Sequence, residues 1–475
     1  MSPALPTPDI SNLAACTEDA RLAALVTDTG PAEPTNYDQL LVRLDAARPK
    51  MPPMYRQIAL DPFKAKLVSI GQNGFHQILL SDPQREGAAG LMLDIAQTFL
   101  QNGEGFENRA TDAFEEVVSD LYAGFLSAED RRGVNPPDLG VVPPLVKWGN
   151  PDFGPYTWPG DATENFDVKC AVVNLPPANA RGGVLAWSAL GHETGGHDII
   201  HADNGLESQL ATAVGDALDA AGFNQISEYW ANRIDETASD VLGILNMGPA
   251  AGIGLIGYFR GLDKAFGGPG KLRSNGPSND PHPADIVRGY LAAATVRLLL
   301  FSNASAWAKL IDAETDKDAG NISLAGVSIS VQQAKASAAV VAKAIAKGKM
   351  AALEHVALAT IQNWRNSDER VTARLRQAMS AAVPVSSSIL QGAFAAHAVA
   401  AAVTAALAGE APVPVIFDRM QGMLKQMHDQ NPAWGPLFVR HPGSIFKHRL
   451  RMDVDDADFE PLQAPKVRAA GAGRK

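Results

Sequence analysis

One proline-dense segment constrains the fold of this chain more than any other feature. Residues 133–162 read GVNPPDLGVVPPLVKWGNPDFGPYTWPGDA. Proline lacks an amide donor and clashes with the preceding helical turn, so this segment cannot be helical and is expected to form loops and short edge strands. FDVKCAVVNLPP follows it, and its β-branched residues, ending at a double proline, make it the best strand candidate in the chain.

Most of the remaining sequence has helical spacing, with apolar residues recurring every three or four positions. Examples are NYDQLLVRLDAAR, REGAAGLMLDIAQTFLQN, NRATDAFEEVVSDLYAGFL, ISEYWANRIDETASDVLGILNMG and ADIVRGYLAAATVRLLLF. From residue 331 the chain is rich in alanine, the best helix former, and QQAKASAAVVAKAIAKGKMAALEHVALATIQNW is its longest helical run. GIGLIGYFRGLDKAFGGPGKLRSNGPSNDPHP is glycine-rich and is expected to be loop-rich. These patterns predict a mostly α protein with a small β element (α+β).

The length of 475 residues suggests two or three packed units, because single cores stop growing well below that size. We expect an N-terminal helical region at 1–130, a central metal-binding domain at 131–330, an Ala-rich helical domain at 331–460, and a disordered polar tail at 461–475.

Charge and composition exclude several partners. The net charge is -11 and no long basic run is present, so nucleic acid is not expected. Residues 387–409 owe their apolar character mostly to alanine and contain Gln391 and His397, which favours a buried helix over a membrane span.

The start of the chain and its two cysteines both bear on where the protein is located. The first residues have no basic and apolar leader pattern, so a cytoplasmic location is expected, with export by another route left open. Cys16 and Cys170 form no CxxC motif and are expected to be unrelated free thiols.

The candidate chemistry lies in residues 191–201, GHETGGHDIIH, which hold three of the ten histidines. In a first interpretation, His192 and His197 bind a metal ion and Glu193 is the general base. Their spacing of five does not fit a regular α-helix, but a single-turn π-bulge would bring them together, and the two glycines make such a departure cheap.

A second interpretation uses the regular i, i+4 pair His197 and His201, with Asp198 as the acidic neighbour. Asp198 is one methylene shorter than glutamate, so its reach to a water molecule would be worse. Glu193 would then be either a further metal ligand or a residue that hydrogen-bonds to a metal ligand. His197 belongs to both interpretations.

A third ligand is expected to be a carboxylate on another helix, since four Cys or His ligands are not available here. Glu236, in IDETASD, suits this position. Asp240 lies one turn later on the same helical face, where it could accept the free N–H of a ligating histidine and fix its tautomer.

The pair HETGGH and ETASD resembles the thermolysin-like zinc metallopeptidases, the gluzincins, in which HExxH precedes a helix bearing ExxxD. The residues after His197, DIIHADNGL, are also similar to those that follow that motif. The resemblance covers about residues 165–290. It implies a zincin-like domain with one zinc ion on His192, His197 and Glu236, Glu193 as base, and Asp240 behind a ligand.

Two departures from that family are visible. One extra residue lies inside the motif, giving an HExxxH form similar to that of TldD-type peptidases, and 38 residues separate His197 from Glu236. The family also uses a histidine in a DxH context to stabilise the oxyanion. Asp280-Pro281-His282 is the downstream match, so the resemblance gives this role to His282.

An intact site of this kind would hydrolyse a peptide or protein substrate. Arg288 and Tyr290 are further candidates to stabilise the oxyanion, although their helical context favours exposed positions. The aromatic residues Trp148, Tyr156 and Trp158 could line the cleft or simply pack in a loop.

Two alternatives remain open from the sequence. His197-Asp198 resembles the HD-domain phosphohydrolases, with Asp240 as the last ligand, but the nearest upstream histidine outside the cluster is His76. The Ala-rich helical half could instead belong to a non-catalytic structural or partner-binding protein that carries a vestigial or structural metal site.

Overall fold

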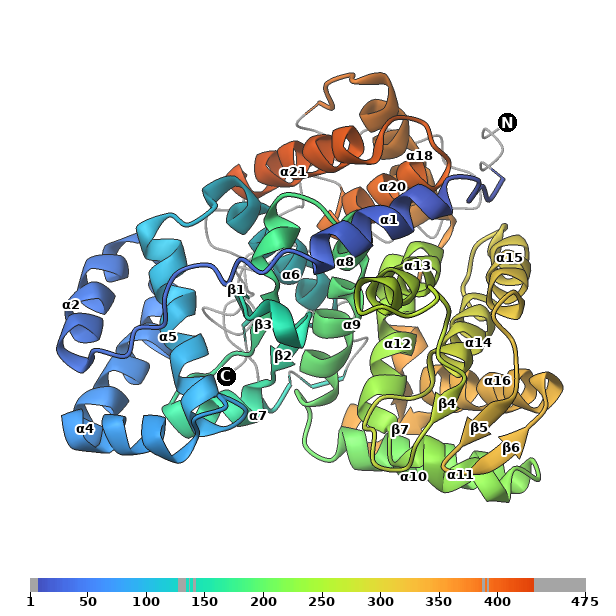
Figure 1. Cartoon of the computed structure of the whole chain (residues 1–475), viewed down its shortest axis with the longest axis horizontal. Coiled ribbons are helices and arrows are strands. Elements are labelled where there is room, and N and C mark those ends of the chain that lie inside the picture. Colours follow the sequence, from blue (N-terminus) through green and yellow to red (C-terminus); the bar gives the residue numbers. More distant parts are fainter. Residues whose placement is uncertain are drawn as a thin grey trace, which may run out of the picture.

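Helices account for 66% of the residues that the structure describes and the strands there form three small sheets, which confirms the predicted α+β class (Figure 1). The computed structural model describes residues 7–126, 134–135, 137–139, 142–386, 389–390 and 393–430. The predicted tail at 461–475 lies outside them. No helix in these ranges is both long and apolar enough to cross a membrane.

The N-terminal helices form their own hydrophobic core at one end of the molecule (Figure 1). They are α2 (Tyr37–Ala47), α3 (Pro53–Tyr55), α4 (Asp61–Ser81) and α5 (Ala88–Glu104). The predicted helices over NYDQLLVRLDAAR and REGAAGLMLDIAQTFLQN are confirmed as α2 and α5. Helix α4 was not expected from the sequence, and Gly71 interrupts it with a positive φ of 70°.

A three-stranded sheet connects this end to the centre of the molecule. Its strands are β1 (Leu145–Trp148), β2 (Tyr156–Trp158) and β3 (Val172–Leu175), in the order β1-β3-β2. Strand β3 is parallel to β1 and antiparallel to β2, with Tyr156 opposite Asn174. The predicted strand in FDVKCAVVNLPP is therefore confirmed as the central strand, and the proline-rich segment supplies the edge strand β2.

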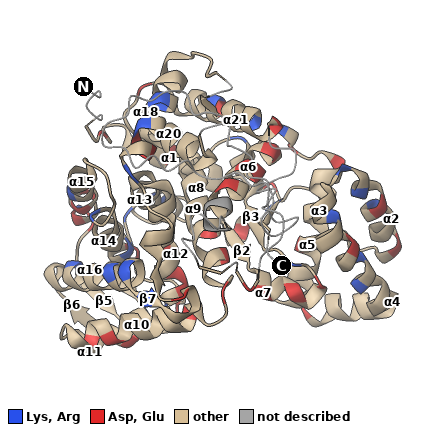
Figure 2. Ribbon diagram, turned by 180° about the vertical axis from the view of Figure 1, so that it is seen from behind, with Lys and Arg blue, Asp and Glu red and all other residues tan. Residues whose placement is uncertain are grey.

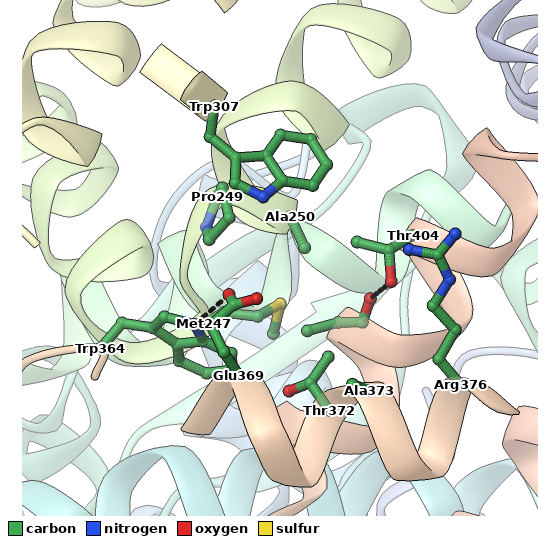
Figure 3. Close-up of a pocket in the computed structure, with 11 residues that line it drawn as sticks. Met247, Pro249, Ala250, Trp307, Trp364, Glu369, Thr372, Ala373, Arg376 and Thr404 are labelled. Carbon is green, nitrogen blue, oxygen red and sulfur yellow. Dashed lines mark hydrogen bonds between the residues drawn. The ribbon is translucent and has the colours of Figure 1, made fainter. Parts of the chain in front are cut away.

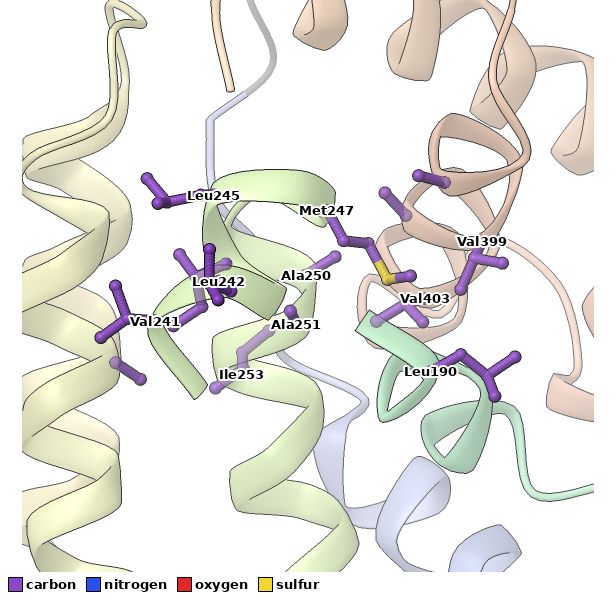
Figure 4. Close-up of a cluster of buried hydrophobic side chains, with 14 of the residues drawn as sticks. Leu190, Val241, Leu242, Leu245, Met247, Ala250, Ala251, Ile253, Val399 and Val403 are labelled. Carbon is purple, nitrogen blue, oxygen red and sulfur yellow. The ribbon is translucent and has the colours of Figure 1, made fainter. Parts of the chain in front are cut away.

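The larger core gathers around three central helical elements: α9 (Leu190–His192), the π-helical turn η6 (Glu193–Asp198) and α12 (Ile234–Met247). Figure 4 shows Leu190 of α9 and Met247 of α12 lying toward Val399 and Val403 of α20 (Ala395–Leu407). Every residue of α20 is buried, so this part of the predicted buried helix at 387–409 is confirmed. Gln391 lies outside the described residues.

The remaining helices surround this centre. They are α1 (Leu13–Ala24), α6 (Asn108–Leu126), α7 (Gly160–Thr163), α8 (Val184–Ser188), α10 (Leu206–Ala220), α11 (Asn224–Ala231), α13 (Pro249–Ala265), α14 (Asp285–Val296), α15 (Ala304–Asp316), α16 (Val331–Lys347), α17 (Leu358–Ile361), α18 (Asn366–Ala381) and α21 (Val413–Asp429). Lys and Arg are interspersed with Asp and Glu along the outer helices (Figure 2).

Two sequence expectations are corrected by the helices. The glycine-rich segment expected to be loop-rich is helical up to the end of α13 at Ala265, and mainly loop only after it. A Cβ at Gly261 would lie 2.9 Å from the Ala20 Cβ, so glycine lets α13 pack closely on α1, and this contact offsets its low helix propensity. The Ala-rich run is not one helix, because α16 ends at Lys347 and the chain then forms a hairpin of β7 (Lys349–Met350) and β8 (Val356–Ala357).

A second hairpin consists of β5 (Ile322–Leu324) and β6 (Val327–Ile329), and its strand β5 also pairs in parallel with β4 (Asn275–Gly276).

The larger core contains residues from both sides of positions 130 and 330. The predicted domain boundaries therefore stay predictions.

A small cavity of about 20 Å³, enough for one water molecule, lies where α12, α13, α15, α18 and α20 meet (Figure 3). Glu369 of α18 lines it and accepts a hydrogen bond of 2.6 Å from Trp364 Nε1. The net pKa of Glu369 is raised to about 7, mainly by burial. The hydrogen bond from Trp364 and the charge of Arg376 lower it, whereas the charge of Asp368 raises it further.

Replacing Glu369 by glutamine is expected to stabilise the protein above neutral pH. The folded-state pKa lies above the unfolded value, so the wild type loses stability as pH rises from about 4.5 to about 7, by about 3 kcal/mol in total. Glutamine keeps an oxygen for Trp364 and has no charge. Thermal melts between pH 5 and 8 should show the variant gaining on the wild type as pH rises, and a constant difference would contradict this.

Candidate metal centre

The π-helical turn brings the two histidines of the HExxxH motif together. Residues Glu193–Asp198 form η6, and the Nε2 atoms of His192 and His197 lie 3.0 Å apart, with the rings at an interplanar angle of 86°. A regular helix would direct side chains five apart in different directions. The π-bulge that the spacing predicted is therefore present, and His192 and His197 form the pair.

Helix α12 packs against this turn at unusually short range. A Cβ on Gly196 would lie 2.4 Å from both Cα and Cβ of Ser239. A Cβ on Gly243 would lie 2.9 Å from the backbone nitrogen of His192. Glycine at these positions thus lets the backbones approach closely enough for short acidic side chains on α12 to reach the histidines.

The carboxylate of Glu236 faces both imidazoles. Its Oε2 lies 3.4 Å from His192 Nε2 and its Oε1 lies 3.6 Å from His197 Nε2. These separations are close to the roughly 3.3 Å between neighbouring ligand atoms around a tetrahedral zinc ion. Oε2 of Glu236 is buried without a hydrogen-bond partner among the described residues. The three side chains therefore fit a zinc ion.

Two aspartates of α12 fix the outer nitrogens of the histidines. Asp240 Oδ1 lies 2.9 Å from His192 Nδ1, and Asp235 Oδ1 lies 2.9 Å from His197 Nδ1. Such contacts set the ring orientation and direct each Nε2 inward. The predicted position of Asp240 behind a histidine agrees with this geometry, whereas Asp235 was not identified from the sequence.

Arg288 of α14 completes the buried charge network. Its guanidinium donates two hydrogen bonds of 2.8 Å to Asp240 and lies 3.4 Å from Glu236 Oε2. Its side chain stacks over the Phe259 ring, with Cζ 4.7 Å from the centroid. Arg288 and Tyr290 are only 6% and 1% exposed, so the exposed positions favoured by the sequence are wrong for both.

These contacts shift the pKa values of the ionisable groups. Burial alone would lower the pKa of His192, but its contacts with Asp240 and Glu236 raise it to about 10. Burial would also raise the pKa of Glu236, yet His192, His197 and Arg288 hold it well below its usual value. The pKa of Asp240 is lowered too, since Arg288 and His192 outweigh its burial. The centre therefore favours ionised carboxylates.

Glu193 lies beside the histidine pair and faces the same pocket. One ligand atom from each of His192, Glu193 and His197 falls within 4.8 Å of the others. Thr157 of the edge strand β2 donates a hydrogen bond of 2.8 Å to Glu193 Oε2. No sequence pattern points to Thr157, because its role depends on the contact between β2 and η6.

The site opens into a pocket of about 470 Å³ between β2, η6, α12 and α13. Four apolar side chains of α13, at helical spacing, line one wall: Leu255, Tyr258, Phe259 and Leu262. His282 is half exposed at the pocket, its Nε2 3.4 Å from Glu236 Oε1, and its backbone N–H donates to Asp280 Oδ1. Tyr156 also lines this pocket.

Several predicted residues lie elsewhere. His201 contacts Asp161 at 3.3 Å and Asp235 at 3.4 Å, and it does not line the pocket, so it lies beside the cluster of His192, His197 and Glu236. Asp198 is buried on another side, near Tyr55 and Cys170: burial raises the pKa of both of these groups, and the charge of Asp198 raises it further. The geometry therefore favours the first interpretation, in which His192 pairs with His197.

The remaining candidates are also outside the pocket. Tyr290 donates to Asp316 Oδ1 at 2.9 Å. Trp148 is buried in the core, and Trp158 Nε1 donates to Asp94 Oδ2 at 2.8 Å. His76, which an HD-type site would need, lies on α4. Cys16 and Cys170 are both buried free thiols, as predicted.

Fold and site together define a mostly helical chain in which a π-helical turn brings His192 and His197 together opposite Glu236 of α12. No protein-family model, curated protein or solved structure matches this chain significantly.

Proposed function

We propose that this protein is a zinc-dependent hydrolase, most specifically a metallopeptidase. The observation that carries the proposal is the convergence of the Glu236 carboxylate on the Nε2 atoms of His192 and His197, at 3.4 and 3.6 Å. These three side chains would hold the ion. Zinc supplies Lewis acidity, which polarises a carbonyl and lowers the pKa of a water molecule.

The protein's own groups carry the proton transfers. Glu193 faces the pocket next to the histidine pair and takes the proton of the attacking water, then passes it to the leaving amine. Thr157 orients this carboxylate through its hydrogen bond of 2.8 Å. Asp240 and Asp235 hold the two imidazoles in place.

Stabilisation of the oxyanion falls to cationic or N–H groups that line the pocket. His282 and Arg288 both line it and both lie 3.4 Å from Glu236. We assign the role to His282, because Arg288 is already engaged by two hydrogen bonds to Asp240. A peptide is the favoured substrate, since an extended chain can pair with the edge strand β2 that borders the pocket.

The ligand set is tested by the metal content of purified variants. His197→Ala and Glu236→Ala are each expected to bind one equivalent of zinc less than the wild type, because three protein ligands are reduced to two. His201→Ala is the matched control, a histidine four residues away that is expected to retain the full content. A loss in His201→Ala, or retention in both ligand variants, would overturn the assignment. Zinc binding without hydrolysis of any peptide would favour a structural role.

A further inference from the structure

A second group of potential ligands joins two helices that are distant in the sequence. Helices α6 and α21 pack side by side. Asp112 and Glu115 are one turn apart on α6, and His428 is in the last turn of α21. One ligand atom of each of these three side chains falls within 4.8 Å of the other two.

The spacing within this group is longer than a hydrogen bond. His428 Nε2 lies 3.6 Å from Asp112 Oδ1 and 4.0 Å from Glu115 Oε2. A hydrogen bond between these atoms would need about 2.7–3.2 Å. Ligand atoms that share a divalent ion at about 2.0–2.2 Å lie roughly 3.3–4 Å apart, depending on the angle at the metal. The separations of His428 from both carboxylates therefore suit a bridging cation.

The Glu115 carboxylate provides the independent sign of a missing partner. Its side chain is 3% exposed, and neither of its oxygens makes a well-formed hydrogen bond with a described residue. Burial and the charge of Asp112 raise the pKa of this carboxyl well above its usual value, and a contact with the Asn102 side chain lowers it only in part. A buried carboxylate is costly unless it is paired or coordinates a metal ion. Glu115 points toward His428, so a cation bound between them would satisfy it.

The surroundings leave the group both acidic and accessible. Lys425 contacts the other oxygen of Asp112, Oδ2, at 3.3 Å, which leaves Oδ1 directed toward His428. The side chains of Asp112 and Lys425 are 28% and 32% exposed, so a hydrated ion can reach the group from solvent.

We propose that Asp112, Glu115 and His428 bind a divalent transition-metal ion of the zinc or manganese class, which fastens α21 to α6. Two carboxylates and one imidazole are ligands that both ions accept. Helix α6 also contacts the π-helical turn η6, so this ion would support the scaffold of the candidate centre from outside its pocket. The proposal does not depend on the hydrolase function.

The test uses the full chain with the first centre disabled by His197→Ala and Glu236→Ala. This protein is expected to bind one equivalent of added zinc, and its Tm should rise by about 2–4 °C at a hundredfold excess over the dissociation constant. Adding Glu115→Gln or His428→Ala should abolish both effects. Asp418→Asn is the matched control, because it removes the exposed Arg109–Asp418 contact of 2.7 Å between the same two helices.

The outcomes separate this site from the first one. Zinc binding that survives in the disabled chain and disappears with Glu115→Gln supports the proposal, whether or not the protein hydrolyses peptides. Zinc binding that Glu115→Gln and His428→Ala leave unchanged would overturn it. Failure of the disabled chain to bind zinc or manganese would overturn it as well. Glutamine preserves the shape of Glu115 and removes a buried charge, so misfolding of that variant is not expected.

Discussion

Replacing Glu193 by glutamine is expected to lower peptide hydrolysis by about 10²–10⁴-fold, the usual contribution of a general base. Glutamine can still accept the Thr157 hydrogen bond of 2.8 Å, so the side chain should keep its place. It cannot take a proton from water. Zinc content should be unchanged, because His192, His197 and Glu236 are intact. Single-turnover assays and metal analysis of the same preparation measure both quantities.

Asp198→Asn is the matched control for this experiment. Asp198 belongs to the same π-helical turn and is also buried, but it does not line the pocket. Burial raises its pKa well above the usual value, so asparagine resembles the protonated side chain and should be tolerated. Activity of Glu193→Gln within tenfold of the wild type, with Asp198→Asn equally active, would exclude Glu193 as the base.

Replacing Gly196 by alanine is expected to cost about 1–3 kcal/mol of stability, the range for overpacking a tight interface. The added Cβ would lie 2.4 Å from Ser239 Cα and Cβ, so η6 and α12 must separate. Because α12 carries Glu236 and η6 carries His197, the same movement should weaken zinc binding. Denaturant unfolding and zinc titration check the two effects together.

Gly215→Ala is the control for this substitution, since Gly215 lies within the helix α10 and its Cβ would meet only Ala231 at 3.9 Å. Alanine there should stabilise the protein by about 0.5–1 kcal/mol, because it removes the entropic cost of a helical glycine. Equal stability and equal zinc affinity of the wild type and Gly196→Ala would show that the close contact does not position the centre.

The fold was predictable where the signal is local. The helical spacing of α2, α5 and α6 and the β-branched run of β3 identified those elements correctly. The prediction was wrong for α13, because the glycines that argue against a helix there are retained by packing on α1. The prediction of one long helix in the Ala-rich run was wrong at Gly348, which follows the end of α16. Alanine content alone does not show where a helix ends.

The candidate site, too, was predictable from the sequence only where the signal is local. The HExxxH spacing predicted a π-bulge and the pair His192 and His197, because both follow from the geometry of a few consecutive residues. The sequence left His201 as an alternative ligand, and only the contacts of His201 with Asp161 and Asp235 place it beside the centre.

The sequence by itself determined a mostly helical chain and a histidine-rich turn whose imidazoles can converge on one point. Only the tertiary structure decided what stands opposite that turn: Glu236 facing both imidazoles, Asp235 and Asp240 behind them, Arg288 from α14 and Thr157 from β2. Helical periodicity is a property of neighbouring residues, whereas this convergence depends on how closely separate elements pack. At Gly196 that distance is set by the absence of a single side-chain atom.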